Sequence, residues 1–217
     1  MVALASHAWG GPAVRYSWDS CNSVVLNKMF TGPGAYTQIV AAVGLNKPLL
    51  SWSISIGLGN ALPDAWSFYY GGCQGSSREV TVTSGGGCPR LPNFSVRSSL
   101  YNSIADDRWH LSVHGSAMVG PIPMPDSSVR YALAVVLFDH SRSATGLQDP
   151  AVACGGAERG LCFVVEDARL LWVDRTLTVP WLENGYLAWQ DPNNLTNCPA
   201  ATPARASTWG QIKSLYR

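Results

Sequence analysis

Short segments in which apolar residues alternate with small or polar ones constrain the fold of this chain more than any other feature. The segments 36–43 and 51–58 show this two-residue period, and in the second Trp52, Ile54 and Ile56 would point the same way. A period of two is typical of a β-strand with one buried face. The run 129–138 is apolar almost throughout, which indicates a central strand covered on both faces.

About ten such segments follow one another. No segment in the body of the chain has the pattern of a long amphipathic helix. The connections between them suit tight turns, since the chain contains 21 Gly and 14 Pro. We therefore predict an all-β fold, an antiparallel two-sheet sandwich of the jelly-roll or immunoglobulin-like kind, stapled by disulfides.

The predicted body spans residues 9–202, and 217 residues are enough for one large β domain or two small ones. A linker-like break at 88–93 leaves open a division into halves 9–90 and 91–202. Residues 1–8 are interpreted as a signal remnant or N-terminal tail, because Ser6-His7-Ala8 fits a small-x-small cleavage pattern. Residues 203–217 form a C-terminal tail, with a short helix expected near its end.

Six cysteines indicate export into an oxidising compartment. Short loops favour two local disulfides, Cys73 with Cys88 and Cys154 with Cys162, and elimination then leaves Cys21 with Cys198. Six cysteines allow fifteen pairings, so this connectivity is a hypothesis. The close ligand pairs of a structural zinc site do not occur in the sequence, and we expect neither metal nor cofactor.

The surface carries few charges, since Asp, Glu, Lys and Arg make up only 13% of the residues. With 15 basic and 14 acidic residues the chain has no field that would gather nucleic acid or anionic lipid. Its longest apolar run is the size of a strand, so no membrane span is expected.

Nine tryptophans and eight tyrosines exceed what a core of this size requires. We select four of them as candidates for exposed rings that stack on a ligand such as a glycan. A second set forms a candidate interface, because the tail would place an apolar stripe on one side of a short helix. That stripe would dock either on its own domain or on a neighbouring molecule or an export component. The stacking candidates are Tyr69, Tyr70, Trp172 and Trp181, and the interface candidates are Trp9, Trp209, Ile212 and Tyr216.

Polar clusters give a weak prediction of catalysis. Asp106 and Asp107 precede His110 and His114, but the two histidines would lie about 13 Å apart on one strand face, so we interpret them as surface residues. The run 139–141 (DHS) contains the residue types of a catalytic triad, yet neighbours on a strand point in opposite directions. The acids that could serve glycoside hydrolysis are Glu158, Glu166, Asp167 and Asp174.

Several motifs resemble those of uncharacterised, apparently secreted proteins of environmental bacteria. The similarity rests on residues 16–22 (YSWDSCN), 30–34 (FTGPG), 62–66 (LPDAW), 191–194 (DPNN) and the terminal 208–217 (TWGQIKSLYR). The terminal motif, T-W-G-x-I-K-x-x-Y-R, is the most distinctive of them. The resemblance implies export and a cysteine-stapled β fold, and it implies no activity.

The sequence therefore predicts a secreted or cell-surface protein that is not an enzyme. The leading hypothesis is a structural or interaction protein that binds itself or another surface protein, as the self-assembling subunit of a layer or fibre. A glycan-binding sandwich and a secreted hydrolase are the alternatives.

Overall fold

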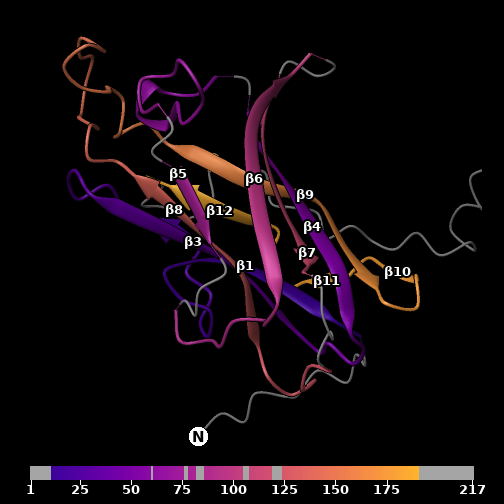
Figure 1. Ribbon diagram of the computed structural model, residues 1–217. Helices are drawn as coiled ribbons and strands as arrows, with labels where there is room; N and C mark the ends of the chain where they lie inside the picture. The colour runs from indigo at the N-terminus through magenta and orange to yellow at the C-terminus, as the bar shows by residue number, and fades with distance from the viewer. Residues whose placement is uncertain are drawn as a thin grey trace, which may run out of the picture.

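The computed structural model describes residues 11–59, 61–75, 78–81, 86–104, 108–118 and 124–190. Two β-sheets pack face to face, which confirms the predicted all-β sandwich (Figure 1). Twelve strands and one short 3-10 helix make up the described part: β1 (Ala13–Trp18), β2 (Asn27–Lys28), β3 (Ala35–Val43), β4 (Leu49–Gly59), η1 (Asp64–Trp66), β5 (Arg78–Thr81), β6 (Phe94–Ser103), β7 (Arg108–Ala117), β8 (Tyr131–Asp139), β9 (Leu161–Trp172), β10 (Leu177–Thr178), β11 (Trp181–Leu182) and β12 (Tyr186–Trp189).

The first sheet has the strand order β11-β1-β3-β8-β5, and the second has the order β2-β12-β9-β4-β7-β6. β10 joins the second sheet by pairing with β9. Most neighbours are antiparallel, but β1 pairs with β11, and β12 with β2, in parallel. Each parallel pair involves a two-residue strand at the outer edge of its sheet, so the sandwich is antiparallel in its centre.

The core is formed by the apolar residues of the alternating segments. Trp52, Ile54 and Ile56 of β4 are all buried and belong to one cluster between the sheets. At one end of the sandwich this core becomes almost entirely aromatic, because rings from several strands and from η1 meet edge to face. The rings at that end come from Trp18, Tyr36, Trp66, Phe68, Phe138, Phe163 and Trp189.

The break at 88–93 does not divide the chain into halves 9–90 and 91–202. β4 lies between β9 and β7 in the second sheet, and β3 pairs with β8 in the first. Strands from both sides of the break therefore share each sheet. The Pro-containing segment instead runs beside β8, where Leu91 N–H donates to the Ala132 carbonyl.

The predicted disulfide pairing is wrong. Cys21 is bonded to Cys88, and Cys73 is bonded to Cys154, with sequence separations of 67 and 81 residues. Cys162 is also disulfide-bonded, whereas Cys198 lies outside the described residues. A preference for short loops failed here because a sandwich brings strand ends together that are far apart in the sequence.

Candidate functional site

Part of the outer face of the first sheet, over β3 and β8, is covered by the chain's own turns. The Cys21–Cys88 disulfide lies over this face and forms a small second core with Ile39, Ala41 and Ala132. Gly86 allows the close approach, since a Cβ at this position would lie 2.5 Å from the Ile39 side chain. This face is therefore closed to a partner at the disulfide.

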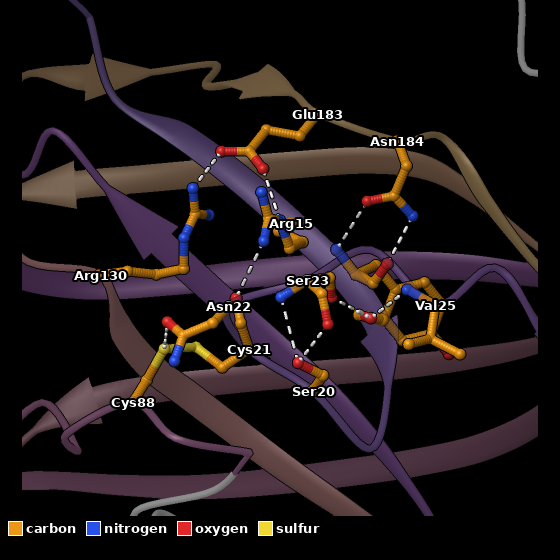
Figure 2. A network of polar contacts seen from close by, with 12 residues as sticks. Arg15, Ser20, Cys21, Asn22, Ser23, Val25, Cys88, Arg130, Glu183 and Asn184 are labelled. Carbon is orange, nitrogen blue, oxygen red and sulfur yellow. Dashed lines mark hydrogen bonds and ion pairs between the residues drawn. A yellow bond between two sulfur atoms is a disulfide. The ribbon is translucent and has the colours of Figure 1, made fainter. Parts of the chain in front are cut away.

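A polar network closes the same sheet along β1 (Figure 2). Glu183 accepts hydrogen bonds from Arg15 Nε and Arg130 Nη2, both at 2.6 Å. Asn184 bonds the backbone of Tyr16 through both ends of its amide. Two cations around one half-buried carboxylate and a doubly bonded amide give this network an architectural role, because they fix the segment after β11 against β1.

The second sheet presents the opposite situation. Its outward side chains on β6, β7, β4 and β9 are mostly short or polar, with the apolar Val164 and Leu171 of β9 as exceptions. They alternate with core residues and remain partly or fully exposed apart from the buried Gly57 and His110. We call this surface the open face. It consists of Ser95, Arg97, Ser99 and Tyr101 from β6, Arg108, His110, Ser112, His114 and Ser116 from β7, Ser51, Ser53, Ser55 and Gly57 from β4, and Glu166, Asp167 and Arg169 from β9.

Strand register arranges the open face in rows that cross the strands. One row is made of hydroxyl groups and ends in a carboxylate, and the next is basic at both ends. The first runs Ser99, Ser112, Ser55, Asp167, and the second runs Arg97, His114, Ser53, Arg169. The sequence analysis missed this surface although its signal was present, since the serines occupy the alternate positions of the strand pattern that predicted the core.

A β-bulge in β9 adds a charged cluster at one end of the open face. The register slips between Ser55 and Ile56 of β4, so that Glu166 is the extra residue. Bulges redirect side chains, and the Glu166 carboxylate lies directly over the backbone of Gly57, where a Cβ would come within 2.3 Å of it. Glycine at this position thus admits the carboxylate to the surface of β4.

The Glu166 carboxylate contacts two residues of β7. Its oxygens lie 3.0 Å from Arg108 Nη1 and 3.0 Å from His110 Nδ1. The His110 ring also stacks on Tyr101 of β6, with centroids 5.6 Å apart and an interplanar angle of 19°. The prediction that His110 is a surface residue is therefore wrong, because Glu166 and Tyr101 cover it.

The other end of the open face is less constrained. His114 is exposed, as the sequence analysis predicted, and lies opposite Arg97 of β6. Within the part of the chain that the structure describes, neither side chain makes a hydrogen bond or ion pair, so both are available to a partner. Arg169 is held beside Asp167 by an ion pair of 2.7 Å on the exposed surface.

The four predicted stacking residues do not form a row. Trp172 is 2% exposed, because the bulge in β9 places it on the core face, and its Nε1 donates to Thr178. Tyr69 is stacked on Trp109 with centroids 4.6 Å apart. Tyr70 and Trp181 are exposed, but Tyr70 follows η1 near the Phe138 end of the first sheet, whereas Trp181 pairs with Ala13 at its other end.

The predicted interface residues Trp9, Trp209, Ile212 and Tyr216 lie outside the described residues, as do Asp106, Asp107 and the segments 1–8 and 203–217.

The triad residue types of segment 139–141 do not converge. His140 is completely buried among aromatic rings, stacked on Trp189 at 5.2 Å, and its Nδ1 lies 2.8 Å from Ser143 Oγ. Burial lowers the pKa of His140 to about 3, against a smaller opposing effect of Asp139. A neutral core histidine is its structural role. Ser141 is exposed, and its backbone N–H donates to Asp139.

The predicted acids are spread along β9. Glu158 precedes the strand and accepts from the Gly146 N–H, Glu166 lies in its middle, and Asp174 follows it, bound to Lys47. The strand residues alone span roughly 16 Å between the start of β9 and Glu166, and roughly 20 Å between Glu166 and its end. Paired carboxyl groups in glycosidases lie within about 10 Å of each other, so Glu158, Glu166 and Asp174 do not make such a site. The fourth predicted acid, Asp167, adjoins Glu166 and forms an ion pair with Arg169.

The described residues contain no group of three or more His, Cys, Asp or Glu side chains arranged to hold a metal ion. They also include no helix of the length and apolarity that a membrane crossing requires.

Comparison with known proteins gives a faint structural likeness and no family. No protein-family model matches the chain, and no curated protein matches its sequence. Among solved structures, a type II cohesin domain from the cellulosome of Acetivibrio cellulolyticus has a TM-score of 0.41 at 8% identity, covering 83% of this chain and 95% of the cohesin. A non-cellulosomal cohesin from Archaeoglobus fulgidus has a TM-score of 0.35 at 10% identity, covering 82% and 89%. At these values the likeness assigns neither partner nor activity.

Proposed function

We propose that this protein is a non-enzymatic extracellular interaction module, a subunit of a surface layer or fibre, which binds a protein partner through the open face of its second sheet. The observation that carries this proposal is the contrast between the two outer faces. One is partly covered by the disulfide-linked turns, and the other presents serine hydroxyls and basic groups at the regular spacing of a sheet.

The chemistry of the open face favours a broad, flat partner. Small hydroxyl side chains such as Ser55 and Ser112 lose little conformational entropy on binding and can donate or accept hydrogen bonds. Arg97 and His114 at the rim add a basic character that an acidic partner surface would complement. Tyr101 contributes the type of aromatic residue that is enriched at protein interfaces.

Disulfide bonding supports an extracellular location. Covalent bonds between Cys21 and Cys88 and between Cys73 and Cys154 form and persist in oxidising compartments. They also suit a protein that must keep its shape outside the cell, where no chaperones refold it.

A bulky substitution at the centre of the open face tests the proposal. Ser55→Trp should abolish co-sedimentation of the exported protein with the envelope fraction of the producing cells, because the ring blocks contact across β4. Thr145→Trp, in an exposed loop away from this face, is the matched control and should sediment like the unsubstituted protein. Equal sedimentation of the Ser55→Trp variant would contradict the proposal.

A further inference from the structure

One edge of the sandwich differs from the others. The outermost strands are β11 and β5 in the first sheet and β2 and β6 in the second. β11 and β2 have two residues each and β5 has four, whereas β6 has ten. Short edge strands are a common protection against unwanted pairing. β6 lacks this protection and runs along the front of the molecule in Figure 1.

β6 also lacks the other protective features of an edge strand. It contains neither proline nor lysine, and its pairing with β7 runs from Phe94 to Ser103 without a bulge. Its single charged residue is Arg97. In an antiparallel pair, alternate residues direct their N–H and C=O groups away from the neighbouring strand. In the described part of the chain, no strand forms a ladder with that outer row of β6.

We infer that β6 pairs antiparallel with β6 of a second copy of this chain, joining two second sheets into one continuous sheet across a two-fold axis. This inference rests on the proposed function and names the partner at one edge of the open face. Two-fold pairing is the commonest symmetry of homo-oligomers, and it requires a self-complementary surface.

The sequence of β6 is self-complementary in a register centred on Ser99. Residues directly opposite each other in an antiparallel pair point to the same side of the sheet. One residue of β6 must therefore lie opposite its own copy, with the two-fold axis between them. An axis at Ser99 places Ser95 opposite Ser103, and Arg97 opposite Tyr101 of the second copy. The cation then lies beside an aromatic ring. An axis at Arg97 would instead bring two like charges together, which is unfavourable.

This pairing would also enlarge the open face. It would extend the row of Ser99 into the same row of the second copy, and the row of Arg97 into the row of Tyr101 and His110, which doubles the length of the surface. The covered face of the first sheet stays outside the interface. A subunit with a two-fold contact at one edge and a second contact through its face has the two contacts that a layer requires.

The oligomeric state of the intact protein tests this inference. Sedimentation velocity at increasing concentration should show a dimer. Ser99→Lys should weaken it several-fold to about tenfold, because two ammonium groups would lie across the axis. Ser116→Lys, on β7 of the same face, is the matched control and should leave the dimer unchanged. A one-to-one mixture of Ser99→Lys and Ser99→Asp chains should restore dimers.

A cysteine substitution tests the register. Directly opposite Cα atoms in an antiparallel pair lie about 4.5–5.5 Å apart, within the range of a disulfide. Ser99→Cys should therefore form a covalent dimer on mild oxidation, and Ser116→Cys should not. Absence of this crosslink would overturn the register.

Two results would overturn the inference altogether. One is a protein that stays monomeric at all concentrations, which would leave β6 to an extended segment of another protein. The other is a dimer that Ser99→Lys does not weaken. Neither depends on the envelope test, because Ser55→Trp lies two strands from the edge and should leave the dimer intact while it abolishes envelope binding.

Discussion

His140 shows how a single residue links the aromatic core to pH. Its ring is enclosed by Trp66, Phe68 and Trp189, and this burial lowers its pKa to about 3. The His140 imidazole is therefore neutral in the folded protein at ordinary pH. Gln74 reaches the same network through Ser143, beside the Cys73–Cys154 disulfide.

This arrangement predicts a loss of stability in mild acid. Above pH 6.5 His140 is neutral in both the folded and the unfolded state. As the pH falls below 6.5, His140 becomes protonated in the unfolded chain, whereas in the folded chain it stays neutral until about pH 3. The free energy of unfolding should therefore fall by up to about 1.4 kcal/mol per pH unit in this window.

Urea unfolding between about pH 4.5 and 6.5, above the usual carboxylate range, would measure this slope. His140→Phe should remove it, whatever the variant's overall stability, because phenylalanine does not titrate. His114→Gln, at the exposed histidine of the open face, should retain it. A slope that is the same in the His140→Phe variant and the unsubstituted protein would contradict this role.

At the scale of single elements, the sequence was a good guide to strands and a poor guide to what joins them. The alternation in 51–58 predicted both the strand and its buried face, since that pattern is local. The Cys21–Cys88 bond was not predictable in the same way, because it depends on which strand ends meet in space. The bulge at Glu166 was equally hidden, and it decides that Trp172 is buried and not exposed.

The disulfides give a prediction at the same scale. Replacing both Cys21 and Cys88 by serine should lower the free energy of unfolding by about 4 kcal/mol, because it releases a loop of 67 residues in the unfolded chain. Guanidinium unfolding would measure the loss. A peptide map of the non-reduced protein is the direct check, and a Cys73–Cys88 or Cys154–Cys162 peptide would contradict the pairing.

At the scale of the whole molecule, the strand order explains why the sequence suggested two halves that do not exist. A Pro-containing segment reads as a linker when only its composition is considered. The sheet order is set by contacts between distant strands, and the hydrophobic pattern of one strand carries no information about its neighbour. The serines of the open face could be read from the strand alternation, but its rows were hidden for the same reason, since they appear only when β6, β7, β4 and β9 are aligned.

Fragments 9–90 and 91–202 should therefore each fail to fold alone. In the first fragment β4 would lose both of its neighbours, β7 and β9, and with them most of the hydrogen bonds that satisfy its backbone. Circular dichroism and thermal melting would show this, with the intact chain as the reference. A cooperative melting transition in either fragment would count against a single interleaved unit.

The two crossed disulfides have a mechanical consequence if the chain is pulled from both ends. A pulling force applied outside Cys21 and Cys154 would pass across one bond to Cys88, back along the chain to Cys73, and across the second bond. Only the 15-residue stretch between Cys73 and Cys88 could then be drawn out, about 50 Å in place of more than 400 Å for the unbonded chain. A chain bonded in this way would extend only a short distance under force and would return over the same short distance.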